Sequence, residues 1–185
     1  VKIPLTPDDV RKMINSATSI RMKAMIYALA TTGMRIAELS SITLDQYNGM
    51  MDNTIIITGK GNKQRSITFP DEAKKFIDQY INTERKHNTR NGDCGLLFVG
   101  NQGNMLNSEY TSAALKRVAK LAGVENYERV TNHLMRTTMA TIAINDGVEL
   151  PVIQKMLGHS NYNTTLRYAK MADEASSNAM AKIRF

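Results

Sequence analysis

The sequence of 185 residues contains one cysteine, Cys94, and three histidines. A single cysteine excludes an internal disulfide and favours a reducing compartment, so we expect a cytoplasmic protein. His87, His133 and His159 lie far apart, without a His-Glu-x-x-His spacing or a cysteine partner, and we therefore expect no metal site. Apolar runs are far shorter than the ~20 residues of a membrane span, and the start shows no signal peptide pattern. These shortages argue against disulfide-stabilised, metal-dependent and membrane-spanning proteins.

Acidic residues are fewer than basic ones. Lys and Arg total 24 against 17 Asp and Glu, which gives a formal net charge of +7. Such an excess favours a nucleic acid partner through sequence-independent attraction to phosphates, although a merely basic protein is the simple alternative. The length allows one domain with a real core. Because the chain begins at Val1 and not at Met, we expect it to be part of a longer protein.

The apolar pattern predicts a mainly α chain with one small antiparallel β-sheet, an α+β fold in a single domain over residues 1–185. Thr6 followed by Pro7 predicts the start of the first helix. Thr54–Thr58 and Arg65–Phe69 predict two strands, joined by the glycine-containing turn Gly59–Lys63. The other helices are expected over residues 20–32, 35–40, 71–86, 108–122, 131–145, 149–156, 163–170 and 173–183.

The stretch from residue 133 to residue 168 concentrates polar groups of one kind. It holds His133, Arg136, His159, Arg167 and Tyr168, without an acidic pair or a cysteine cluster. Cations can hold an anion, imidazoles can bond its oxygens or move protons, and a phenol can attack it. This stretch therefore predicts a site for an anionic target without a metal.

Tyr168 is the candidate nucleophile, although a tyrosine among apolar neighbours is usually part of a core. A free tyrosine has a pKa of about 10, so only about one part in a thousand is phenolate at pH 7. A nucleophilic tyrosine therefore needs nearby cations or a base. The same stretch supplies both, which distinguishes Tyr168 from Tyr27, Tyr47 and Tyr162.

Two arginines are candidates for binding a phosphate. Arg35 follows Gly33 at the start of a short helix, and Glu38 three residues later can fix its guanidinium. Arg136 lies three residues after His133, so both project from one helix face. Two arginines can bind both non-bridging oxygens of a phosphodiester. The simple alternative for each is a surface arginine with a local salt bridge.

The expected hairpin has a basic tip. Lys60 and Lys63 lie in the turn and Arg65 follows it, and we predict that Lys63 and Arg65 contact DNA. A mobile lysine here can enter a groove or reach a reacting phosphate. The Gly-Lys pair lacks the Ser or Thr and the upstream glycine of a P-loop. The alternative is an exposed basic turn.

These motifs, in this order, resemble those of a known family. Thr32–Leu39 is similar to the first arginine motif of the tyrosine recombinases, the phage integrase family. Gly59–Arg65 is similar to their hairpin lysine motif, and His133–Arg136 to their His-x-x-Arg motif. Leu157–His159 and Tyr168, nine residues after this histidine, complete the set. Each motif is weak alone, but five in order are specific.

The resemblance implies a role for each residue. Four would bind and activate the scissile phosphate: Arg35, His133, Arg136 and His159. Lys60 would protonate the leaving 5′ oxygen, and Tyr168 would attack the phosphorus to form a 3′-phosphotyrosine. Glu38 would support the site. The phosphotyrosine intermediate conserves the energy of the broken phosphodiester bond, so the resemblance implies no ATP, metal or other cofactor.

The resemblance also implies partners and architecture. The target would be double-stranded DNA, and recombinases of this family act as homotetramers that pass a C-terminal segment, here residues 172–185, to a neighbour. The free chain is expected to be monomeric if that segment packs on its own domain. The family's N-terminal helical DNA-clamp domain is expected to be missing. Thr137 departs from the His or Lys that often follows the second arginine.

We therefore expect a DNA integrase or site-specific recombinase, with a mobile-element integrase preferred over a chromosome-resolving recombinase. A type IB topoisomerase, which relaxes DNA without exchange, is one alternative. A DNA-binding module that does not cut is another, and a basic helical interaction protein is a third.

Overall fold

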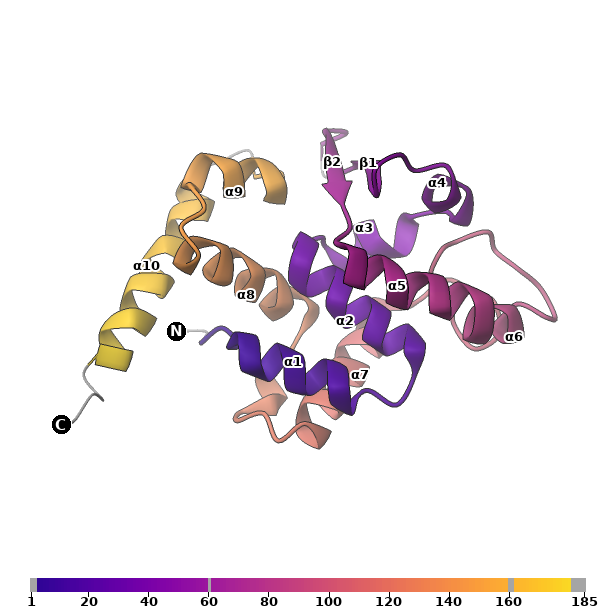
Figure 1. Cartoon of the computed structure of the whole chain (residues 1–185), viewed down its shortest axis with the longest axis horizontal. Helices are drawn as coiled ribbons and strands as arrows, with labels where there is room; N and C mark the ends of the chain where they lie inside the picture. Colours follow the sequence, from indigo (N-terminus) through magenta and orange to yellow (C-terminus); the bar gives the residue numbers. More distant parts are fainter. Residues whose placement is uncertain (1–2, 60, 160–161, 181–185) are drawn as a thin grey trace.

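The computed structural model describes residues 3–59, 61–159 and 162–180, which form a mainly helical fold with one small antiparallel sheet, as predicted (Figure 1). The α-helices are α1 (Pro7–Ser16), α2 (Ile20–Thr32), α3 (Ile36–Ser41), α4 (Leu44–Asn48), α5 (Asp71–Tyr80), α6 (Lys86–Asn88), α7 (Ser108–Leu121), α8 (Asn132–Asn145), α9 (Leu150–Leu157) and α10 (Tyr162–Met180). A π-helix, η1 (Ile81–Arg85), and a 3₁₀ helix, η2 (Tyr127–Arg129), accompany them. Within the described ranges, none of the helices has the length and apolarity needed to cross a membrane.

Helix α2 lies at the centre of the fold and packs against α1, α5 and α8 (Figure 1). Its side chains are buried on most sides, as expected for a central helix. The Glu84 carboxylate of η1 accepts hydrogen bonds from the backbone N–H groups of Ile20 (2.6 Å) and Arg21 (3.0 Å) at the start of α2. The helix ends at Gly33, whose φ of 62° places it in the left-handed region. This end lies beside the site.

The helix expected over residues 71–86 consists of α5, η1 and α6 in direct succession. The π-helical turn contains Arg85, whose buried guanidinium donates two hydrogen bonds to Asp93, of 2.8 and 2.9 Å. It also donates to the carbonyls of Leu96 and Leu97. Arg85 thus fastens the loop after α6 to the core. The short helix α4 was not predicted.

Strands β1 (Thr54–Thr58) and β2 (Gln64–Thr68) pair antiparallel, with Ile57 opposite Arg65. Ile57 and Ile67 lie on the buried face, while the side chain of Ile56 is 60% exposed on the other face. The second strand begins one residue earlier than expected. The turn that follows β1 stands above α3 and α5 (Figure 1).

Two C-terminal helices were expected, over residues 163–170 and 173–183, but α10 is one helix from Tyr162 to Met180. The prediction was wrong because neither glycine nor proline interrupts this stretch, so nothing ends the first helix at residue 170. Tyr168 and Ala172, one turn apart, are both buried. Helices α8, α9 and α10 form one side of the molecule (Figure 1). Residues 181–185 lie outside the described part.

Candidate functional site

A pocket of about 860 Å³ lies where α3, the hairpin turn, α7, α8, the end of α9 and α10 meet. Five of the six predicted catalytic residues line it: Arg35, His133, Arg136, His159 and Tyr168. The sixth, Lys60, lies outside the described residues. Lys63 lines the pocket from the turn and is exposed. Residues spread over more than 130 positions of the sequence thus share one space.

Arg136 is held at the floor of the site by two helix ends. Its Nη1 donates to the carbonyl of Gly33 and its Nη2 to the carbonyl of Leu157, each at 2.5 Å. These carbonyls lie at the C-terminal ends of α2 and α9, where the helix dipoles are negative. Both helices end in a left-handed glycine, Gly33 or Gly158. The side chain of Arg136 is therefore fixed in a site that two helices form.

The charge of Arg136 is costly because the residue is 3% exposed. Burial lowers the pKa of its guanidinium to about 10, and the nearby charge of Arg35 adds to this shift. The group still carries its proton at neutral pH. A buried cation beside a second cation creates a strong preference for an anion in the pocket.

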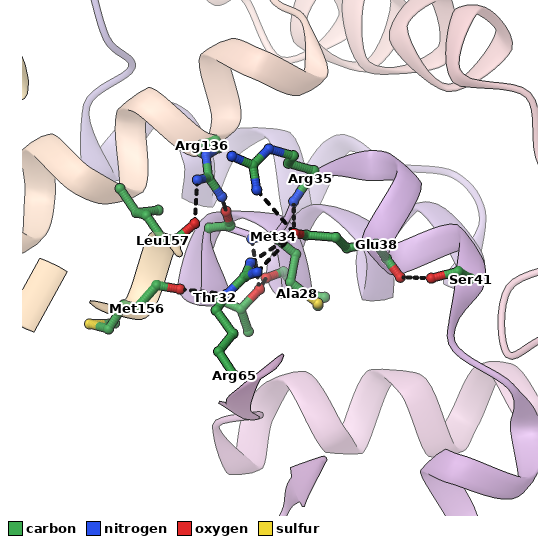
Figure 2. A network of polar contacts seen from close by, with 11 residues as sticks. Ala28, Thr32, Met34, Arg35, Glu38, Ser41, Arg65, Arg136, Met156 and Leu157 are labelled. Atoms are coloured by element: carbon green, nitrogen blue, oxygen red, sulfur yellow. Dashed lines mark hydrogen bonds and ion pairs between the residues drawn. The ribbon is translucent and has the colours of Figure 1, made fainter. Parts of the chain in front are cut away.

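Arg35 is oriented by Glu38, as expected. The Glu38 carboxylate accepts from the backbone N–H of Arg35 (2.7 Å) and from its Nη1 (3.1 Å) (Figure 2). The side chain of Arg35 remains 37% exposed and faces the pocket. Burial acts to raise the pKa of Glu38, but the hydrogen bonds from Arg65 and from the Arg35 backbone outweigh it, so its pKa lies below 4.5. Glu38 is thus ionised.

Arg65 points away from the position that we expected. Its Nη1 and Nη2 donate to the two oxygens of Glu38 at 2.8 and 2.7 Å, and its Nε donates to the carbonyl of Met156 at 2.9 Å (Figure 2). The side chain is 8% exposed. Side chains alternate along a strand, so Arg65 shares the inner face of β2 with buried Ile67. The structure places the Arg65 side chain beneath the site and not on the exposed tip of the hairpin.

His159 and Tyr168 lie next to each other. Their rings stack with centroids 5.8 Å apart, and the Nδ1 of His159 is 3.1 Å from the hydroxyl of buried Thr165. Burial lowers the pKa of His159 to about 4, and the charges of Arg136, Arg35, Arg65 and His133 lower it further in that order. The imidazole is therefore neutral at pH 7 in the ligand-free pocket.

Tyr168 belongs both to the apolar core and to the lining of the pocket. The residue is 6% exposed and packs with Met139, Ile153 and Leu157 in a small apolar cluster. It also lines the pocket beside Arg136 and His159. The apolar cluster holds the ring, and the polar pocket surrounds its accessible side.

Four polar residues of the pocket wall were not singled out from the sequence: Ser108, Ser112, Thr131 and Asn132. Thr131 caps α8, accepting from the N–H of Leu134 at 3.1 Å, and this cap was the one available signal because it comes two residues before His133. Asn132 donates to the Ser112 hydroxyl at 2.9 Å, a long-range contact that no local pattern reveals. Among the residues that the structure describes, no cluster of three potential metal ligands occurs.

Comparison with known sequences identifies relatives. The sequence profile of the phage integrase family matches residues 4–175. The tyrosine recombinase XerD of Yersinia pestis is 32% identical over 155 residues, which cover 84% of this chain and 51% of XerD. The tyrosine recombinase XerC of Lactobacillus delbrueckii subsp. bulgaricus is 30% identical over 174 residues, covering 89% of this chain and 57% of XerC. The chain spans about half the length of these relatives.

Solved structures share the fold. The crystal structure of XerA recombinase superposes with a TM-score of 0.83 at 27% identity, covering 100% of this chain and 67% of that chain. The XerH recombinase, bound to its palindromic difH substrate, gives a TM-score of 0.76 at 22% identity over 98% of this chain and 54% of its own. The profile match covers nearly all of the helices described above, and the five motifs converge on one pocket. On this evidence the chain belongs to the phage integrase family of tyrosine recombinases.

Proposed function

We propose that this chain is a catalytic domain that cuts and rejoins double-stranded DNA at specific sites through a 3′-phosphotyrosine. The observation that supports this is the pocket, in which one tyrosine, two histidines and two arginines line a single space. In this proposal the pocket binds an anion through fixed cations and presents a tyrosine hydroxyl beside them. This combination suits a phosphodiester, whose single negative charge must be held while its phosphorus is attacked.

The two arginines bind the phosphate in this proposal. Arg136 commits one hydrogen bond from each of two nitrogens to backbone carbonyls, so others of its five N–H groups remain for a ligand. Arg35 is held by Glu38 on one side and exposed on the other. Together they bind the non-bridging oxygens and stabilise the extra charge of the five-coordinate transition state.

The Tyr168 hydroxyl gives up its proton to solvent as its oxygen bonds to the phosphorus, and the bond between phosphorus and the 5′ oxygen breaks. The cations of the pocket stabilise the negative charge that develops on the reacting oxygens. We assign Lys60 as the proton donor to the leaving oxygen on its motif alone. His133 and His159 bond the phosphate oxygens. A 5′-hydroxyl from another strand then reverses the attack and rejoins the DNA, so no cofactor enters the reaction.

The biological setting is a narrower part of the proposal. The abundance of integrases within the family favours a mobile-element integrase, whereas identities of 30–32% to XerC and XerD favour a Xer-like recombinase as the second candidate. Capture of genomic fragments by the protein separates them. An integrase captures the ends of an element, and a Xer-like enzyme captures one chromosomal site.

Assembly on DNA is also proposed. XerH and the Tn1549 transposon integrase are known in complexes with DNA, which supports DNA as the partner of this chain. We propose a homotetramer on two duplexes, with residues 172–185 passing to a neighbour. Ala172 is buried within its own chain and residues 181–185 lie outside the described part, so the exchange rests on the resemblance. The mass of the protein–DNA complex in solution tests it.

Covalent capture tests the proposed function. The chain is incubated with nicked duplexes of randomised sequence, in excess chelator, and the products are separated on a denaturing gel. The nick lets the short cleaved strand diffuse away, which traps the phosphotyrosine. We expect a covalent complex with wild type and none with Tyr168→Phe, which retains binding. A complex of equal yield with Tyr168→Phe would show that another residue attacks.

The alternatives give other results in this assay. A DNA-binding module that does not cut binds the duplexes but forms no covalent complex. A type IB topoisomerase forms the complex and relaxes supercoiled plasmids, but exchanges no strands between two captured sites. Sequencing the captured strands also identifies the preferred site and the cleaved bond.

A further inference from the structure

Arg65 lies at a junction of three segments that each carry a proposed catalytic residue. Its guanidinium binds Glu38, which in turn holds Arg35 (Figure 2). Its Nε binds the carbonyl of Met156 in the last turn of α9, ahead of His159. Its own strand, β2, continues directly from the turn that contains Lys60 in the sequence. One side chain therefore touches or extends from all three segments.

Two glycines make room for this guanidinium. A Cβ atom added at Gly59 would lie 3.1 Å from the Nη1 of Arg65 and 3.0 Å from the Oε1 of Glu38. A Cβ atom added at Gly158 would lie 3.1 Å from the same Nη1. Gly59 immediately precedes Lys60 in the sequence, and Gly158 immediately precedes His159. The guanidinium thus fits closely between the backbones of two catalytic segments.

The contacts leave Arg65 poorly placed to bind DNA itself. The side chains of Arg65 and Glu38 are 8% and 5% exposed. Three N–H groups of the guanidinium donate to protein acceptors, out of the five that arginine has. A planar fork that meets a carboxylate with two parallel bonds fixes direction as well as distance. Lysine keeps the charge but cannot reproduce this geometry.

We propose that Arg65 is a positioning residue that sets the relative placement of the Arg35 loop, the lysine hairpin and the His159 turn. It acts through Glu38 and through the carbonyl of Met156, and it does not touch the DNA. The inference rests on the proposed function, because it concerns how the three segments are placed around the scissile phosphate. Its loss therefore slows cleavage of bound DNA without weakening binding.

The test compares Arg65→Lys with a matched control, Arg85→Lys. Arg85 is also buried, also binds one carboxylate with two bonds and also donates to backbone carbonyls, but it lies outside the pocket. Both variants should lose thermal stability. At saturating protein, Arg65→Lys should form the covalent complex roughly 10–100-fold more slowly, as expected for small misplacements of reacting groups, whereas Arg85→Lys should match wild type.

A second substrate identifies the hairpin as one of the positioned segments. In the captured duplex, sulfur replaces the 5′ oxygen of the scissile bond. The phosphorus–sulfur bond then breaks with its electron pair on a thiolate, which needs no proton because thiols have a pKa of about 8.5. On oxygen DNA the leaving group needs the proton assigned to Lys60. The deficit of Arg65→Lys should therefore shrink at least about threefold on sulfur DNA.

A second variant tests the positioning role without removing Arg65, in case Arg65→Lys does not fold. Gly59→Ala keeps both Arg65 and Glu38 in the sequence, but its methyl group would lie 3.1 Å from Nη1 of Arg65 and 3.0 Å from Oε1 of Glu38, so we expect it to shift the hairpin relative to them. It should show the same slow cleavage on oxygen DNA and the same recovery on sulfur DNA. An equal deficit on both substrates would mean that Arg65 only supports the fold, and weaker binding with normal cleavage would make it a DNA contact. Either result overturns the proposal.

Failure of the proposed function gives a different result. If wild type forms no covalent complex with any duplex, even with the expected N-terminal domain restored, recombinase activity is rejected and so is the role of Arg65. If wild type cleaves and Arg65→Lys cleaves equally fast, only the positioning role is rejected.

Discussion

At the scale of single residues, the pocket shifts the pKa of a histidine away from its value in a free amino acid. His159 is half-buried among cations, and this partial burial first and the arginine charges second lower its pKa from 6.5 to about 4. Between these values the unfolded chain binds a proton that the folded chain does not. The contribution of His159 to stability is therefore complete above pH 6.5 and is lost as the pH falls toward 4.

This sign predicts a pH effect. His159→Gln removes the group that takes up a proton on unfolding, so its free energy of unfolding should fall less between pH 7 and pH 5 than that of wild type. Urea unfolding at the two pH values measures the difference. His87→Gln, at an exposed position away from the pocket, should keep the wild-type dependence. An identical pH dependence in His159→Gln and wild type would contradict the assigned shift.

Some features of single residues could be predicted from the sequence, and others could not. Local signals were sufficient for the cap at Thr6 and for the helix end at Gly33. Arg65 was predicted to contact DNA because it follows a basic turn, yet alternation with Ile67 along β2 indicated its inward direction. The hydrogen bond from Arg136 to Gly33 spans 103 positions, and no local pattern predicts it.

At the scale of elements, close helix packing sets the position of the pocket floor. A Cβ atom added at Gly33 would lie 2.2 Å from Cε of Met139 in α8 and 2.7 Å from Cδ2 of Leu157 in α9. Any larger residue at this position would force the ends of the Met139 and Leu157 side chains to move. Helix α10 packs against α8 as one continuous helix, and the absence of glycine and proline from residues 162–180 was a signal in the sequence for this continuity.

Gly33→Ala should therefore destabilise the fold more than the left-handed backbone alone requires. The control is Gly123→Ala, whose φ of 71° is similar but whose added methyl group meets nothing within 4 Å. We expect a loss of about 1 kcal/mol for Gly123→Ala from backbone strain, and a further ~1–3 kcal/mol for Gly33→Ala from overpacking. Equal losses in urea unfolding would show that the side chains of Met139 and Leu157 move aside freely.

At the scale of the whole molecule, the net charge of +7 favours polyanions in general, and the fold decides which cations are exposed. Lys63 lines the pocket and is exposed, whereas Arg65, two residues later, is enclosed. The sequence predicted the charge and the order of the motifs. It did not predict which cations face outward, because that depends on packing between distant segments.

The salt dependence of DNA binding tests whether an exposed lysine contacts DNA. If Lys63 contacts a phosphate, Lys63→Ala should reduce the slope of log K against log salt by about 0.9, the value for one released counterion. Lys12→Ala, on α1 outside the pocket, should leave the slope unchanged. Fluorescence anisotropy with a captured duplex gives both slopes. A wild-type slope in Lys63→Ala would remove Lys63 from the interface.

The attachment of Arg136 to two helix ends has a consequence for genetic screens. Substitution of this arginine removes a proposed phosphate-binding group and also leaves the carbonyls of Gly33 and Leu157 without their donor. A screen for recombination and a screen for protein abundance would both report the same position. Inactive alleles at Arg136 therefore identify a catalytic role only when the amount of folded protein is measured alongside them.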